Sequence, residues 1–163
     1  MTELAAQFEA MEFGRVATFI ASGNVLFESD DADETRLETM IETRLAGALG
    51  YEVDTFVRTR AEVGVVAGAQ PFPEKEMGDS ANTIHVCLLK APLSVESSRR
   101  LEACRTEVDE FRSHGREFYW LCRIRTSESI VWRLPEIKAV ALKTSTMRNI
   151  TMIRKLAAKF PAT

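Results

Sequence analysis

The chain of 163 residues is 45% hydrophobic and 28% charged, which is typical of one folded domain or two small ones. No apolar run approaches the roughly 20 residues that a membrane span needs. The N-terminus also lacks the basic and apolar regions of a secretory signal. These features predict a cytoplasmic protein with no membrane association, and they identify no function directly.

The net charge of −3 is unevenly distributed. Residues 1–50 contain ten acidic and three basic residues, a net charge of −7, whereas residues 133–159 contain seven basic residues and one acidic residue, a net charge of +6. Such an asymmetry indicates either a surface that faces anions or the ordinary solvated faces of helices. Both interpretations stay open at this point.

The first half follows the pattern helix, strand, strand, helix, strand. Apolar spacing predicts a helix over 2–12, strands over 15–21 and 25–28, a helix over 30–49 and a strand over 51–58. Between the first two strands, Gly23 and Asn24 tolerate the left-handed backbone of a tight reversal. We therefore expect a hairpin with Ser22, Gly23 and Asn24 at its tip.

The second half repeats this plan after a polar linker at residues 74–80. It is predicted to contain a strand over 83–89, a helix over 94–104, strands over 108–113 and 117–123, an interrupted helical segment over 131–142 and a last helix over 150–160, and a short helix over 60–68 precedes it. We infer an α+β protein of two ferredoxin-like halves, residues 1–74 and 75–163, with antiparallel sheets and helices on one face. The first half lacks the first strand of this plan.

Adjacent residues of a strand face opposite sides of a sheet. We therefore expect that Tyr119 and Trp120 are not both core residues, and that one of them is a candidate stacking surface for a base.

The sequence contains little that predicts catalysis. Cys87, Cys104 and Cys122 are too widely spaced for a disulfide framework or a zinc ribbon, so buried free thiols are expected. His85 shares a strand face with Cys87, but no further ligand is spaced with them. His114 lies in a polar turn. We predict no metal and no cofactor, and the catalytic residues, if any, are unknown.

The strongest candidate site precedes the last helix. Thr144–Asn149 bring hydroxyl groups, an arginine and backbone N–H groups to a helix start, which suffices to bind phosphate or carboxylate. The alternative is a capping cluster in which Arg148 pairs with an acidic neighbour. Together with the hairpin tip, the predicted anion-binding residues are Ser22, Gly23, Asn24, Thr146, Arg148, Asn149 and Thr151.

The segments Phe19–Phe27 and Thr146–Leu156 resemble the bacterial domain-of-unknown-function family 1697, as do the Ala69–Pro73 turn and the Gly115–Trp120 strand. The resemblance implies cytoplasmic proteins of two ferredoxin-like halves without an established reaction or ligand. Members usually begin with a strand and a glycine-rich loop, whereas Met1 lies almost at the first helix here. Strand 24–28 and strand 53–58 are then expected to lack their shared neighbour, which another segment or chain would supply; a homodimer by strand addition is one hypothesis.

The leading interpretation is a module that binds a small anionic ligand. One alternative is binding of nucleic acid through Arg154, Lys155 and Lys159, or of a protein partner through the same basic helix. A second alternative is an enzyme, for which His85, His114 and Glu128 are weak candidates for an acid or base.

Overall fold

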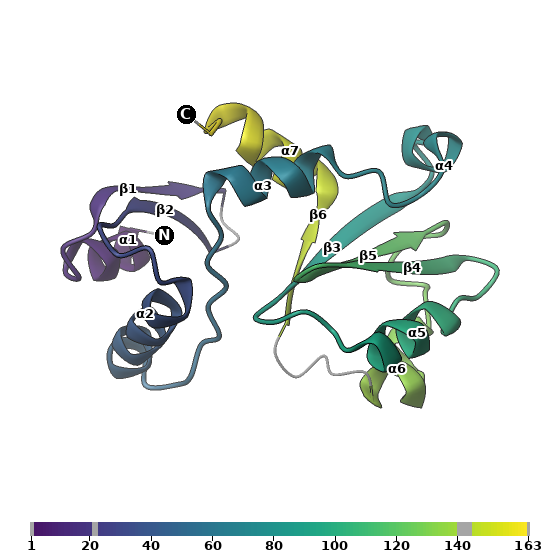
Figure 1. Cartoon of the computed structure of the whole chain (residues 1–163), viewed down its shortest axis with the longest axis horizontal. Helices are drawn as coiled ribbons and strands as arrows, with labels where there is room; N and C mark the ends of the chain where they lie inside the picture. Colours follow the sequence, from purple (N-terminus) through teal and green to yellow (C-terminus); the bar gives the residue numbers. More distant parts are fainter. Residues whose placement is uncertain (1, 21–22, 140–144, 163) are drawn as a thin grey trace. The chain divides into compact units, whose positions relative to one another are not determined.

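The computed structural model describes residues 2–20, 23–139 and 145–162 of the chain (Figure 1). The chain forms two compact units, Met1–Arg58 and Thr59–Thr163. The boundary expected between residues 74 and 75 lies inside the second unit, because helix α3 (Arg60–Gly68) packs on helix α7 (Ile150–Lys159) of that unit. The α+β class with antiparallel sheets is confirmed.

The first unit is built around a β-hairpin and two helices. Its elements are α1 (Thr2–Glu9), β1 (Gly14–Phe19), β2 (Asn24–Glu28) and α2 (Glu34–Leu49). The two strands pair antiparallel, with Ala17 opposite Leu26. Phe8, Ile41 and Leu45 form the buried centre of this unit.

The hairpin turn follows the local chemistry of its residues. Gly23 has φ +75°, which a side chain would disfavour, and Asn24 donates from Nδ2 to the carbonyl oxygen of Phe19 at 3.2 Å. Ser22 lies outside the described residues.

The prediction of a strand over residues 51–58 is wrong. This segment joins no sheet, and its backbone is held by helix α2 instead: the N–H of Thr55 donates to Glu42 at 2.7 Å and the N–H of Val57 donates to Glu38 at 2.8 Å. Among the described residues, β2 pairs with β1 alone.

The second unit contains a four-stranded antiparallel sheet in the order β4-β5-β3-β6. Its elements are α3, α4 (Glu74–Gly78), β3 (Thr83–Leu89), α5 (Val95–Ala103), β4 (Asp109–His114), β5 (Glu117–Cys122), the 3-10 turn η1 (Val131–Arg133), α6 (Pro135–Ala139), β6 (Ser145–Asn149) and α7. From β3 to β6 this is a complete ferredoxin-like β-α-β-β-α-β arrangement. Residues 145–149, for which the sequence pattern predicted no element, form strand β6.

Helices cover both faces of this sheet (Figure 1). One cluster joins Cys87, Phe111 and Trp120 to α5 and α6, and the other joins Val86, Tyr119 and Leu121 to α3 and α7. The expectation that Tyr119 and Trp120 are not both core residues is therefore wrong. They are 2% and 0% exposed, because the α3–α7 pair supplies a second covering layer.

None of the described helices is long and apolar enough to cross a membrane.

Candidate functional site

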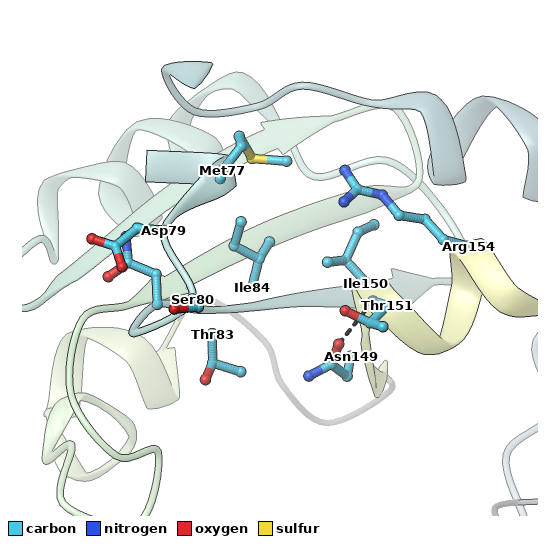
Figure 2. Close-up of a pocket in the computed structure, with 11 residues that line it drawn as sticks. Met77, Asp79, Ser80, Thr83, Ile84, Asn149, Ile150, Thr151 and Arg154 are labelled. Atoms are coloured by element: carbon cyan, nitrogen blue, oxygen red, sulfur yellow. Dashed lines mark hydrogen bonds between the residues drawn. The ribbon is translucent and has the colours of Figure 1, made fainter. Parts of the chain in front are cut away.

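A pocket of about 260 Å³ opens at the start of α7 in the second unit (Figure 2). One wall is the turn between α4 and β3, and the other wall is the first turn and a half of α7. The pocket is lined by Met77, Gly78, Asp79, Ser80, Asn82, Thr83, Ile84, Asn149, Ile150, Thr151 and Arg154.

The helix start is fixed by Asn149, the last residue of β6. Its extended backbone ends the strand, and its side-chain oxygen accepts from the N–H of Thr151 at 2.8 Å. The dashed line in Figure 2 marks this bond. The pocket therefore faces the positive end of the helix dipole, and the first turn of α7 carries no acidic residue to offset it.

Arg154 lies one turn after Ile150, on the same side of α7. Its Nε donates to the carbonyl oxygen of Ala67 in α3 at 3.2 Å, which anchors the side chain at the pocket rim. No carboxylate of the described residues pairs with this guanidinium. Figure 2 shows it reaching back over the pocket from α7. An anion in the pocket would thus meet a cation whose position is already fixed.

One acidic side chain lines the pocket. Asp79 lies at the end opposite Arg154 in Figure 2, and its carboxylate already accepts from the N–H of Ala81 at 2.9 Å. The remaining polar side chains of the lining are those of Ser80, Asn82, Thr83, Asn149 and Thr151, of which Asn149 and Thr151 lie at the helix start (Figure 2). The pocket therefore offers neutral donors and one cation to a ligand, with the single carboxylate at its far end.

Two of the predicted anion-binding residues, Asn149 and Thr151, line this pocket. Thr146 and Arg148 do not line it. Arg148 lies opposite Val86 and thus on the α3–α7 face, where its Nη1 donates to the Thr146 hydroxyl at 2.7 Å. Burial lowers the pKa of Arg148.

The hairpin tip with Gly23 and Asn24 belongs to the first unit, so the pocket is built without it. Arg154 was predicted on a nucleic-acid surface, and the wall formed by residues 77–84 was not predicted. The polar run Asp79–Thr83 could have indicated this wall. However, the other wall, at the start of α7, is distant in the sequence.

The weak catalytic candidates lie outside the pocket. His85 stacks on Trp120 with ring centroids 5.0 Å apart, and its Nε2 is 3.3 Å from the Thr126 hydroxyl oxygen. His114 is exposed at the end of β4, and Glu128 is exposed in a turn. No group of three or more His, Cys, Asp or Glu in the described part of the chain could hold a metal ion.

The thiols are buried structural groups. Cys87, Cys104 and Cys122 are all free, and burial raises the pKa of Cys87 to about 12. Such a thiol is not a nucleophile near neutral pH.

Comparisons with known proteins identify a family without assigning an activity. The family model described as "Protein of unknown function (DUF1697)" matches residues 1–119. The structure titled "The structure of conserved bacterial protein SP0830 from Streptococcus pneumoniae" is similar with a TM-score of 0.76 at 18% identity, over 99% of this chain and 89% of that chain. At this identity the likeness shows the fold alone. No curated protein matches.

Proposed function

Since the chain belongs to the DUF1697 family, whose function is unknown, we propose its role from the pocket geometry: it binds a small anionic ligand, carrying phosphate or carboxylate, at the start of α7. The observation that carries this proposal is the position of Arg154, anchored on Ala67 and facing a polar pocket at a helix N-terminus. The volume of about 260 Å³ suits a small metabolite better than a polymer.

Two electrostatic features support an anion over a cation. The dipole of α7 and the guanidinium of Arg154 both favour negative charge in the same space. The carboxylate of Asp79 is engaged by the N–H of Ala81. A ligand oxygen near the helix start would accept from Arg154 and from the Thr151 hydroxyl.

Thermal unfolding with added anions tests the proposal. We expect inorganic phosphate or succinate to raise the Tm relative to chloride at equal ionic strength, because a ligand at ten times its Kd stabilises the folded state by about 1.4 kcal/mol. The Arg154→Gln variant should lose most of this increase.

Lys155→Gln is the matched control. Lys155 is the next residue on α7, is exposed, and does not line the pocket. It should keep the full increase in Tm. Equal losses in the two variants would show general charge screening and would refute a specific site.

Nucleic-acid binding stays a prediction. Lys155 and Lys159 lie one turn apart on the exposed side of α7. That alternative requires binding that weakens steeply with salt and depends on both lysines. Because Arg154 is anchored in the pocket, Arg154→Gln should affect this binding less than Lys155→Gln.

A further inference from the structure

The pocket at the start of α7 has opposite charges at its two ends. Arg154 reaches over one end from α7, and Asp79 lies at the other end, in the turn after α4 (Figure 2). Among the described residues that line the pocket, no other is charged. A ligand that spans the pocket therefore meets a cation at one end and a carboxylate at the other.

The carboxylate of Asp79 has room for a further donor. Its Oδ1 accepts from the N–H of Ala81 at 2.9 Å, a bond that uses one oxygen and leaves the negative charge in place. No side chain within the described ranges donates to the other oxygen or forms an ion pair with it. Arg123 contacts α4, but it pairs with Glu76 and Glu110. Asp79 is exposed, so its carboxylate is accessible to a ligand in the pocket.

Three classes of small anion differ in the group that they would bring to Asp79. A second anionic group would be repelled, so a dicarboxylate such as succinate binds by one end and gains nothing from the other. A hydroxyl group could donate one hydrogen bond. An ammonium group could donate the same bond and also neutralise the carboxylate, and charge-assisted hydrogen bonds are about twice as strong as neutral ones. Charge complementarity therefore favours a ligand with a cationic end.

We propose that the pocket binds a small zwitterion, whose phosphate or carboxylate lies at the α7 end and whose ammonium group contacts Asp79. The inference rests on the anion site proposed above and adds the second group of its ligand. Ser80, the next residue of the turn, also lines the pocket, and its hydroxyl oxygen can accept from the ammonium group. The volume of about 260 Å³ limits the spacer between the two charged groups to a short chain.

Titration of the isotope-labelled full chain, followed by NMR, tests the proposal with matched pairs of ligands. Each pair has a short alkyl chain, of two, three or four carbons, with a phosphate at one end, and only one member carries an amino group at the other end. We expect the aminoalkyl phosphate to bind about three- to fivefold more tightly than the alkyl phosphate at the length that fits, because the ion pair at Asp79 is partly solvated. The preference should weaken with added NaCl.

Asp79→Asn removes the charge and keeps an oxygen for the N–H of Ala81. It should abolish the preference for the aminoalkyl phosphate without weakening the binding of inorganic phosphate. Glu74→Gln is the matched control. Glu74 lies at the exposed start of α4, outside the pocket lining, and its substitution removes the same charge. This variant should keep the full preference.

The outcomes separate the zwitterion from the anion site itself. Binding of inorganic phosphate with no aminoalkyl preference at any length, a preference that survives in Asp79→Asn, or an equal loss in Glu74→Gln would each overturn the zwitterion and leave the anion site standing. Hydroxyalkyl phosphates that bind as tightly as the aminoalkyl ones would overturn it in favour of a neutral hydroxyl group. If neither inorganic phosphate nor any alkyl phosphate binds, the anion site is refuted and the zwitterion with it.

Discussion

The carboxylate of Asp109 organises the interior of the second unit. The side chain is 1% exposed and accepts from Trp120 Nε1 at 2.8 Å, from the Ser129 hydroxyl at 2.9 Å and from the Thr106 hydroxyl at 3.0 Å. It thereby joins strand β5 to the segments before β4 and before η1. A buried carboxylate with this many donors is costly to remove, because each donor would lose its acceptor.

Asp109→Ala should destabilise the protein by about 3 kcal/mol, since it leaves the buried Trp120 N–H and two hydroxyls without an acceptor. Asp109→Asn keeps one acceptor oxygen and should cost less. Chemical denaturation followed by tryptophan fluorescence measures both. A loss below about 1 kcal/mol in the alanine variant would contradict this role.

His85 should make stability depend on pH. Burial lowers its pKa below the ordinary value of 6.5, so the unfolded chain binds more protons than the folded one as pH falls. The contribution of His85 to the free energy of unfolding is complete above pH 6.5. It is lost as the pH falls from 6.5 through the lowered pKa of the folded state. The Tm should therefore be lower at pH 5.5 than at pH 7.5.

His85→Phe keeps the stacking on Trp120 without a titrating group, and it should reduce this difference in Tm. His114→Asn, at an exposed turn, is the control.

The carboxyl groups with lowered pKa values cannot account for the effect. The hydrogen bond from Arg36 lowers the pKa of Asp31 below 3.8, and the hydrogen bond from Arg123 lowers the pKa of Glu76 below 4.5. An unchanged difference in His85→Phe would refute the assignment.

Among the elements, helix α2 fixes the segment 51–58, which precedes α3, by hydrogen bonds to its backbone. The chain pattern of residues 51–58 is that of a strand, with Val53 and Val57 packing on the apolar cluster of the first unit. No described strand lies beside it, and carboxylates of α2 take the backbone N–H groups instead. Glu38 is only 5% exposed, which reflects this use.

Glu38→Ala should expose the N–H of Val57, and Glu42→Ala should expose that of Thr55. Each should cost about 1–2 kcal/mol within the first unit. Amide hydrogen exchange measures the effect site by site. We expect faster exchange at Val57 in the first variant and at Thr55 in the second. Equal exchange at both amides in both variants would contradict the pairing.

Local sequence patterns predicted most helices and strands correctly. Elements that depend on contacts between distant parts of the chain were not predicted. The Asn149 cap and the apolar spacing of α7 are local, so the helix start was predicted correctly. Strand β6 was missed because Ser145–Asn149 are polar, and only the register with β3 makes them a strand. The strand at 51–58 was predicted from composition, but a strand also needs a neighbour.

In the molecule as a whole, the packing of helices on both faces of the second sheet determines which buried residues the sequence could predict. Tyr119 and Trp120 are both buried only because α3, which the sequence placed with the first half, packs on the second sheet beside α7. The same packing fixes Arg154 through Ala67. The pocket therefore depends on residues 77–84, Ala67 and α7 coming together, and no local pattern predicts that. Asn149 and Thr151 could be found from the sequence, whereas the cation that faces them could not.

Anion binding at the start of α7 is measured most directly by titrating the isotope-labelled chain with inorganic phosphate and following the amide chemical shifts by NMR. We expect saturable shifts concentrated at Ile150, Thr151, the 79–83 turn and the Arg154 Nε–H signal, and no such shifts in Arg154→Gln. Shifts that do not saturate, or that spread over Lys155, Lys159 and the other exposed cations, would contradict a specific anion site at the start of α7.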